Sequence, residues 1–217
     1  MADPQKILSA RLERGLEILG IEVTTKQLQA LLHYQALLVQ WNQRFNLTAV
    51  RDPEAMIVRH LLDSLAISHC VKNRSIADVG TGAGLPGLPL GIIDEQRKVT
   101  LLDSNGKKTR FLNHVKQELV LTNITIEQSR VEDFYPETAF EVVVSRAFTQ
   151  LDKMVPACRH LLKEGGRVFA MKSQSVSEEI AAMGDVAKVI AIHNIAVPFL
   201  DEERVLVELQ LTTKDKP

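Results

Sequence analysis

The sequence is poor in cysteine and lacks long apolar runs. Its two cysteines, Cys70 and Cys158, form no Cys-x-x-Cys pair, so neither a disulfide scaffold nor a thiolate metal site has support. No stretch approaches the roughly 18 consecutive apolar residues that a membrane span needs. Charged residues between Asp3 and Arg14 stand where a secreted protein has an apolar signal core. We therefore expect a cytoplasmic protein in a reducing compartment.

Metal-ligand spacings and an excess of basic residues are missing as well. The six histidines are dispersed without Cys or acidic partners at ligand spacing, which predicts that there is no metal site. The net charge of −1 means that any attraction to nucleic acid must come from a local basic patch. Hydrophobic residues make up 45% of the 217 positions, enough to bury the core of one α/β domain with an attached helical piece.

Residues 1–69 are predicted to be a helical region packed on a second region, 70–217. Thr24 and Gln27 fit a capping box at a helix start. An apolar stripe at helical spacing follows and is expected to face a core: Leu28, Leu31, Leu32, Leu38, Trp41 and Phe45. Another helix is predicted over 54–68, because an aspartate cap and a proline precede it. Its apolar face consists of Met56, Ile57, Leu61, Leu62 and Leu65.

Residues 70–217 alternate short apolar runs with helical segments, which is typical of a parallel sheet covered on both faces. The first four strands are predicted at 75–79, 99–102, 124–128 and 141–144. Helices are expected from about Leu88, Lys107 and Leu151. A helix end, a Gly-Gly turn and a fifth strand are expected within 162–170.

The end of the chain follows another pattern. After a helix around 176–183, two β-rich runs at 187–197 and 204–212 follow without a long helix between them, which indicates an antiparallel pair. The sequence thus predicts an α/β, Rossmann-like fold. Its sheet is expected to be mostly parallel with an antiparallel C-terminal strand, and the helical region is an N-terminal extension.

The strongest chemical signal is the run 78–87, DVGTGAGLPG, between a predicted strand and a predicted helix. Glycines permit a sharp turn and a close approach of the backbone to a ligand, and the next helix start offers free amide donors. Gly82 and its neighbours are therefore expected to lie against a nucleoside cofactor. Asp103 follows the second strand, where a carboxylate can accept hydrogen bonds from both ribose hydroxyls. Its alternative role is to cap the next helix.

The glycine run fits two cofactors, because 82–87 is a Gly-x-Gly-x-x-Gly of the kind that binds nicotinamide dinucleotides. Asp78 favours a methyl donor, since a carboxylate suits an ammonium or sulfonium group and opposes a pyrophosphate. Glu132 and Asp133 follow the third strand, where an adenine amino group would donate. Methyltransferase sheets share the antiparallel ending. An NAD-dependent oxidoreductase is the alternative, although neither tyrosine has a lysine at the fourth following position.

Five segments form a distinctive set: 41–48 (WNQRFNLT), 59–65 (RHLLDSL), 78–87, 101–104 (LLDS) and 145–147 (SRA). Together they resemble the bacterial small-subunit rRNA guanine-N7 methyltransferase family (RsmG, also called glucose-inhibited division protein B), and the likeness covers nearly the whole chain. The run 105–110 departs from the family, which more usually has a hydrophobic residue before a basic run.

The resemblance implies a cofactor, a substrate and site residues. S-adenosyl-L-methionine is the implied methyl donor. The implied acceptor is N7 of a guanine in 16S ribosomal RNA, in a conserved loop near the decoding centre. The positions implied to contact the cofactor are Gly80, Leu85, Val131, Glu132 and Arg146, and Arg146 is also implied to lie at the junction with the substrate.

The loop at 145–148 (SRAF) limits the kinds of acceptor atom that can be methylated, because two acceptor motifs are missing from it. It has neither an Asn/Asp-Pro-Pro-aromatic run to hold an exocyclic amine nor a Pro-Cys nucleophile to attack a pyrimidine. Guanine N7 has a lone pair and no proton to remove, so its methylation requires no general base. No catalytic residue is therefore predicted, and His60 is not expected to act as a base. These absences permit N7 chemistry without establishing it.

Basic residues near the expected sheet edge are candidates for RNA binding. Arg146 ends a strand where ligands of open α/β sheets bind. Lys107, Lys108 and Arg110 open a helix at the same edge and fit contacts to phosphates, but a solvated helix face explains them equally well. Phe148 either stacks on the target base or packs internally. A non-catalytic RNA-binding assembly factor is a further alternative, and the sequence leaves open both the oligomeric state and whether naked rRNA or a particle is the substrate.

Overall fold

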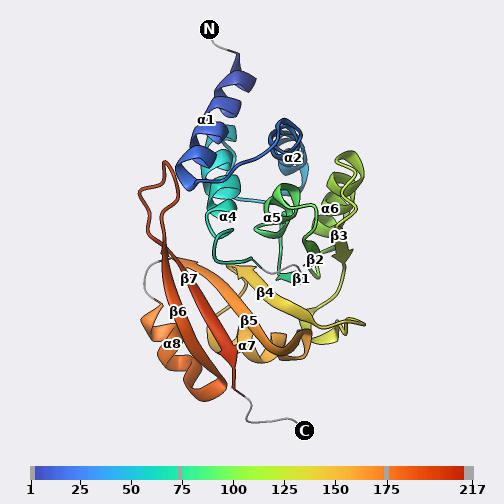
Figure 1. The fold of residues 1–217 in the computed structure, drawn as a ribbon. Coiled ribbons are helices and arrows are strands. Elements are labelled where there is room, and N and C mark those ends of the chain that lie inside the picture. The colour runs from blue at the N-terminus through green and yellow to red at the C-terminus, as the bar shows by residue number, and fades with distance from the viewer. Residues whose placement is uncertain (1–2, 73–74, 174–175, 213–217) are drawn as a thin grey trace.

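The computed structural model describes residues 3–72, 75–173 and 176–212, and within them a seven-stranded sheet forms the centre of the molecule (Figure 1). The strands stand in the order β3-β2-β1-β4-β5-β7-β6. Their bounds are β1 Ser75–Val79, β2 Lys98–Leu102, β3 Ile124–Glu127, β4 Phe140–Arg146, β5 Leu162–Ser173, β6 Ala187–Ile195 and β7 Arg204–Leu211.

The strand directions confirm the predicted fold class. β1 pairs with β2 and β4, β2 with β3, and β4 with β5, all in parallel. β7 lies antiparallel between β5 and β6. From β1 the sheet extends to β2 and β3 on one side and to β4 and β5 on the other. The carboxyl ends of β1 and β4 therefore flank the switch point at which open α/β sheets bind ligands.

The Gly-Gly turn predicted before the fifth strand is wrong. β5 runs without interruption through both glycines, and its register against β4 shifts between Phe140 and Val142. The additional residues interrupt the regular pairing, and Gly165 has a φ of 75° among them, a conformation that glycine adopts without steric cost. The preceding helix ends in a 3-10 turn, η3 Arg159–Leu161.

Helices cover both faces of the sheet (Figure 1). On one face lie α5 Gly87–Ile93, α6 Gly106–Glu118 and the N-terminal helices, which share one buried cluster. On the other lie α7 Leu151–Cys158 and α8 Ser177–Met183, in a second cluster. Among the described residues, no helix has the length and apolar character to cross a membrane.

Two of the N-terminal helices, α2 and α3, begin at the predicted caps. The bounds of the N-terminal helices are α1 Pro4–Leu19, α2 Thr25–Phe45, α3 Pro53–Met56, the π-helical η1 Ile57–Leu62 and α4 Asp63–Leu65. Thr24 and Gln27 form the predicted capping box, and the Asp52 carboxylate accepts from the Ala55 amide at 2.7 Å. α3, η1 and α4 follow one another without a break, so the helix predicted over 54–68 is present but contains a π segment that its apolar spacing does not show.

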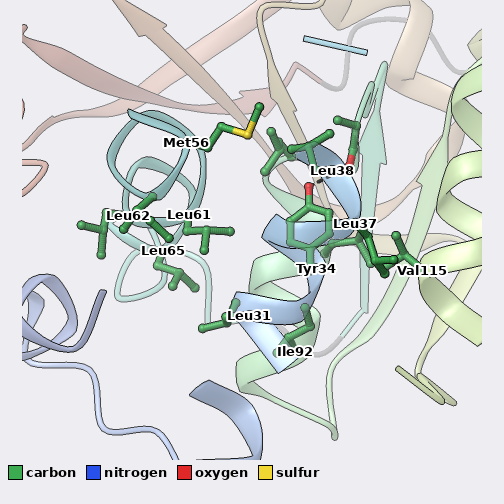
Figure 2. Close-up of a cluster of buried hydrophobic side chains, with 14 of the residues drawn as sticks. Leu31, Tyr34, Leu37, Leu38, Met56, Leu61, Leu62, Leu65, Ile92 and Val115 are labelled. Carbon is green, nitrogen blue, oxygen red and sulfur yellow. Dashed lines mark hydrogen bonds between the residues drawn. The ribbon is translucent and has the colours of Figure 1, made fainter. Parts of the chain in front are cut away.

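Figure 2 shows the core that joins these helices to the sheet. The helical segment from α3 to α4 buries its whole predicted apolar face, from Met56 to Leu65. The stripe on α2 is only partly right: Leu31 and Leu38 are buried, whereas Phe45, at the end of the helix, is 39% exposed and packs against Trp41. Tyr34 lies between the two buried leucines on the same helix face and is fully buried.

Candidate active site

The Asp78 carboxylate fixes the glycine loop that follows β1. The Asp78 Oδ2 atom accepts hydrogen bonds from the Thr81 hydroxyl at 2.6 Å and from the Gly87 amide at 2.7 Å, so one carboxylate oxygen joins both ends of the loop. Burial raises the pKa of Asp78 to about 7, and the two hydrogen bonds act in the opposite direction. These bonds fix the loop, whereas the carboxylate itself is fully buried and is not among the residues that line the pocket described below.

The loop is also tied to α2. The buried Tyr34 hydroxyl donates to the Ala83 carbonyl at 2.7 Å, and burial raises the pKa of this phenol. Sequence reasoning missed this residue. The available signal was its position between Leu31 and Leu38 on one helix face, since a buried tyrosine needs a partner for its hydroxyl.

Asp103 lies at the end of β2 and faces the same loop. Its Oδ2 atom accepts from the Gly82 amide at 2.9 Å and lies 3.3 Å from the Lys108 ammonium, and its Oδ1 atom accepts from the Asn105 amide at 2.9 Å. The N-cap of α6 is Asn105, whose side chain accepts from the Lys107 amide. The alternative role of Asp103 as the helix cap is therefore wrong.

These elements enclose a cavity of about 340 Å³, here called the first pocket. It is lined by Val79, Gly80, Leu102, Asp103, Ser104, Lys108, Ser129, Arg130, Val131, Glu132, Ala147 and Phe148. Four predicted cofactor positions are among them: Gly80, Asp103, Val131 and Glu132. Gly82, Leu85 and Arg146 are outside this lining.

Two of these three residues support the pocket from behind. Gly82 holds the Asp103 carboxylate through its amide, and Leu85 is buried in the core beneath the loop. Lys108, predicted to contact RNA, lines the first pocket instead and pairs with Asp103. Lys107 and Arg110 are exposed on α6.

Phe148 covers the first glycine of the loop. A Cβ atom on Gly80 would lie 2.3 Å from the Phe148 Cδ2 atom, so the ring rests directly on the glycine backbone. Gly80 also has a φ of 64°, and Ala147, the residue before Phe148, has a φ of 55°. Both the backbone conformation and the ring contact therefore require glycine at position 80.

A second pocket, a cavity of about 390 Å³, meets the first at Ala147, which lines both. Its wall carries four basic and two acidic side chains: Arg59, Arg146, Lys172, Arg204, Asp63 and Glu202. The Arg146 Nη1 atom donates to Asp63 Oδ2 and to the Arg59 carbonyl, each at 2.8 Å. Arg146 thus lies at the boundary of the two pockets but faces the second.

His60 also lines the second pocket, in a neutral form. Its Nδ1 atom lies 2.9 Å from the Arg59 carbonyl, which can only accept, so Nδ1 carries the proton. Its Nε2 atom then accepts from the Thr48 hydroxyl at 2.9 Å. Burial and the nearby Arg146 charge lower the pKa of His60 to about 4. Among the residues that the structure describes, no group of three His, Cys, Asp or Glu side chains is arranged to hold a metal ion.

Comparison with known proteins gives concordant results. A family model described as "GidB: rRNA small subunit methyltransferase G" matches residues 27–207. Ribosomal RNA small subunit methyltransferase G of Pseudomonas paraeruginosa is 48% identical over 202 residues, which are 93% of this chain and 94% of that protein. The protein of the same name from Hydrogenovibrio crunogenus is 45% identical over 201 residues, 93% of each chain.

One of the similar solved structures is a glycopeptide N-methyltransferase complexed with (S)-adenosyl-L-methionine. It matches with a TM-score of 0.57 at 15% identity, and the match covers 70% of this chain and 95% of that chain. At this identity the likeness concerns the fold alone. It agrees with the parallel sheet and its antiparallel C-terminal strands.

Proposed function

The chain belongs to the GidB family, rRNA small subunit methyltransferase G, and on that premise we propose that it methylates N7 of a guanine in small-subunit ribosomal RNA. S-adenosyl-L-methionine is the methyl donor in this proposal. The observation that carries it is the junction of two pockets at Ala147, one lined by the glycine loop with Asp103 and Glu132 and one lined with arginines. A ribosomal RNA substrate would place the reaction in the cytoplasm, as the sequence predicts.

The first pocket fits the methyl donor in size and in chemistry. Its volume of about 340 Å³ lies in the range of small-molecule sites. The Asp103 carboxylate, at the end of β2, is placed to accept from ribose hydroxyls, and Glu132 offers a carboxylate to an adenine amino group. Gly80 and Val131 would contact the bound molecule directly.

The other predicted cofactor residues would act from outside the lining. Gly82 would keep Asp103 in place, Leu85 would support the loop from the core, and Arg146 would close the side toward the second pocket. When bound, S-adenosyl-L-methionine supplies an electrophilic methyl group on a sulfonium. The protein then has to orient the acceptor and exclude water from the junction.

The state of His60 supports N7 as the acceptor atom. Guanine N7 has no proton to remove, so a site for it needs no free base. His60, which lines the second pocket, has its Nε2 lone pair engaged by Thr48 and a pKa of about 4. Placement of the acceptor by side chains such as Arg146 would supply most of the catalysis.

The RNA surface is proposed to include Arg146, Lys107 and Arg110. Lys107 and Arg110 are exposed on α6, beside the first pocket, and can reach phosphates. Lys108, which the sequence placed with them, is better suited to the cofactor because it pairs with Asp103. We also propose that the helical region 1–69 and the catalytic region 70–217 work as one enzyme, since they share a core and both contribute to the second pocket.

The test is methyl transfer to small-subunit particles from a strain that lacks this gene. The protein is incubated with radiolabelled S-adenosyl-L-methionine and the particles, and the labelled nucleoside is identified after digestion. We expect 7-methylguanosine from the wild type and from Asp185→Asn, an exposed carboxylate outside both pockets, and a loss of at least about 10-fold in Asp103→Asn. Label in another nucleoside would overturn the N7 assignment, and no label on particles or free RNA would overturn methyl transfer.

A further inference from the structure

Asp63 is a buried carboxylate between two arginines. Its side chain is 4% exposed, and the residue is the first of α4, directly after the π-helical segment η1. The Oδ2 atom accepts from Arg146 Nη1 at 2.8 Å, and the Oδ1 atom lies 3.3 Å from Arg204 Nε. Arg146 ends β4 and Arg204 begins β7, so the carboxylate joins three segments that are distant in the sequence.

The two arginines differ in how many donors are already in use. Arg204 forms an ion pair with Asp63, and it donates hydrogen bonds to the Glu202 carboxylate at 2.8 Å and to the Glu203 carbonyl at 3.1 Å. The side-chain hydrogen bonds of Arg146 to the described residues all use Nη1, which donates to Asp63 and to the Arg59 carbonyl. A guanidinium has five N–H donors, so the Nε and Nη2 groups of Arg146 remain for a ligand.

The fixed side of Arg146 determines where its other donors point. Its side chain is 22% exposed and lines the second pocket, next to the shared residue Ala147. A planar guanidinium anchored at one nitrogen by two acceptors keeps a single orientation, which a long flexible side chain would otherwise lose. π-helical segments such as η1 recur at functional sites, and η1 supplies the Arg59 carbonyl while Asp63 follows it directly.

We propose that Asp63 is a positioning residue for the acceptor side of the reaction. It holds Arg146 so that the remaining N–H groups of the guanidinium meet oxygen acceptors of the RNA nucleotide in the second pocket. The inference rests on the proposed function, because it requires an RNA acceptor in that pocket. A role limited to stability would leave the acceptor parameters of folded enzyme unchanged.

The first measurement compares Asp63→Asn with a matched control, Glu208→Gln. Glu208 is a partly buried carboxylate on β7, paired with Arg167 at 3.3 Å and His193 at 3.2 Å, and it is outside the lining of both pockets. For Asp63→Asn we expect kcat/KM toward undermethylated particles to fall about 10- to 100-fold, since small misplacements of a binding group have effects of this order. Affinity for S-adenosyl-L-methionine should stay within about 2-fold, because Asp63 and Arg146 both line the second pocket and neither lines the first. The control should change neither value by more than about 2-fold.

A double-mutant cycle with Arg146→Ala separates positioning from a general structural role. If Asp63 acts through Arg146, Asp63→Asn should cause little further loss of kcat/KM in the Arg146→Ala background. Additive losses, a parallel loss of cofactor affinity in folded enzyme, or a kcat/KM equal to that of the control would overturn the inference. Failure of wild-type enzyme to label particles would instead overturn the proposed function, so the two failures are distinguishable.

Thermal unfolding establishes whether Asp63→Asn is folded. If it is not, Arg204→Gln weakens the same network from its more exposed side, because Arg204 is 20% exposed. It should lower kcat/KM for particles about 3- to 10-fold without changing cofactor affinity. Wild-type kcat/KM in Arg204→Gln would then count against the positioning role.

Discussion

The two pockets at the carboxyl edge of the sheet are held together by different forces. In the first, backbone amides of Gly82 and Asn105 fix the Asp103 carboxylate, and the lining follows directly from strand ends. In the second, ion pairs fix the wall. Arg146 and Asp63 are 83 positions apart, and Arg59 and its partner Glu202 are 143 apart. The first pocket should therefore be sensitive to backbone conformation and the second to the loss of charge.

The largest effect is expected for Gly80→Ala. An alanine there has to adopt a φ of 64° and displace Phe148, whose Cδ2 atom would lie 2.3 Å from the new Cβ. We expect affinity for S-adenosyl-L-methionine, measured by calorimetry, to fall by at least about 100-fold, because the loop or the ring must shift by an ångström or so.

Gly20→Ala is the control for this change. Gly20 has a φ of 65° but open space around its Cβ position, so the substitution has the same backbone cost of about 1–2 kcal/mol without the contact. It should lower Tm and leave cofactor affinity intact. Equal affinities in the two variants would show that Phe148 does not control the first pocket.

Asp103→Asn should produce the reverse of the kinetic pattern expected for Asp63→Asn. The amide oxygen still accepts from a backbone amide, so the loop stays closed, but the charge that ribose hydroxyls would meet is lost. We expect the Kd for S-adenosyl-L-methionine to rise about 10- to 100-fold, as for other hydrogen bonds to charged groups. KM for particles should change little. If KM for particles rises instead, the assignment of the two pockets is reversed.

The sequence predicts the first pocket well because its parts are local. The glycine run and Asp103 each follow a strand, and carboxyl ends of parallel strands meet at one edge of a sheet. Gly80, Asp103 and Glu132 accordingly line one cavity, together with Val131, which the family resemblance implied. Lys108 shows the limit of this reasoning, because its place on the first turns of α6 brings it to Asp103 and leaves its side chain only 33% exposed.

The second pocket could not be predicted in the same way. No motif joins Asp63 to Arg204, because their contact depends on β7 inserting antiparallel beside β5 and on a π segment that apolar spacing does not reveal. Arg146 was placed correctly at a strand end, but its partners were not. Phe45 shows the same limit in the core. Its position on the apolar stripe of α2 does not reveal how far along the helix the neighbouring elements pack against it.

Tyr34→Phe tests whether the helical region stabilises the first pocket. The change removes the buried donor to the Ala83 carbonyl and leaves that carbonyl unpaired, which costs about 1–3 kcal/mol. We expect a lower free energy of unfolding in urea and a cofactor affinity reduced about 3- to 10-fold, since the loop loses one of its ties. Tyr135→Phe is the control, because Tyr135 is 76% exposed and lies outside the lining of both pockets. If the two variants behave alike, the tie between α2 and the glycine loop does not contribute to cofactor binding.

The smallest effect on methyl transfer is expected for His60→Gln. Loss of a general base costs about 100-fold or more, whereas loss of a neutral packing histidine should cost much less than that. The wild-type rate should also show no inflection near pH 6.5.

The dependence of stability on pH has a defined sign. The pKa of His60 in the folded protein, about 4, lies below the ordinary value of 6.5, so the unfolded chain binds the proton more readily. The contribution of His60 is therefore present above about pH 6.5 and is lost as the pH falls toward 4. The free energy of unfolding, measured in urea at pH 7 and at pH 5, should therefore fall more for the wild type than for His60→Gln. The expected difference between the two falls is on the order of 1–2 kcal/mol. A rate inflection near pH 6.5 that disappears in His60→Gln, with a rate loss of about 100-fold, would instead make His60 a base and would contradict direct attack by N7.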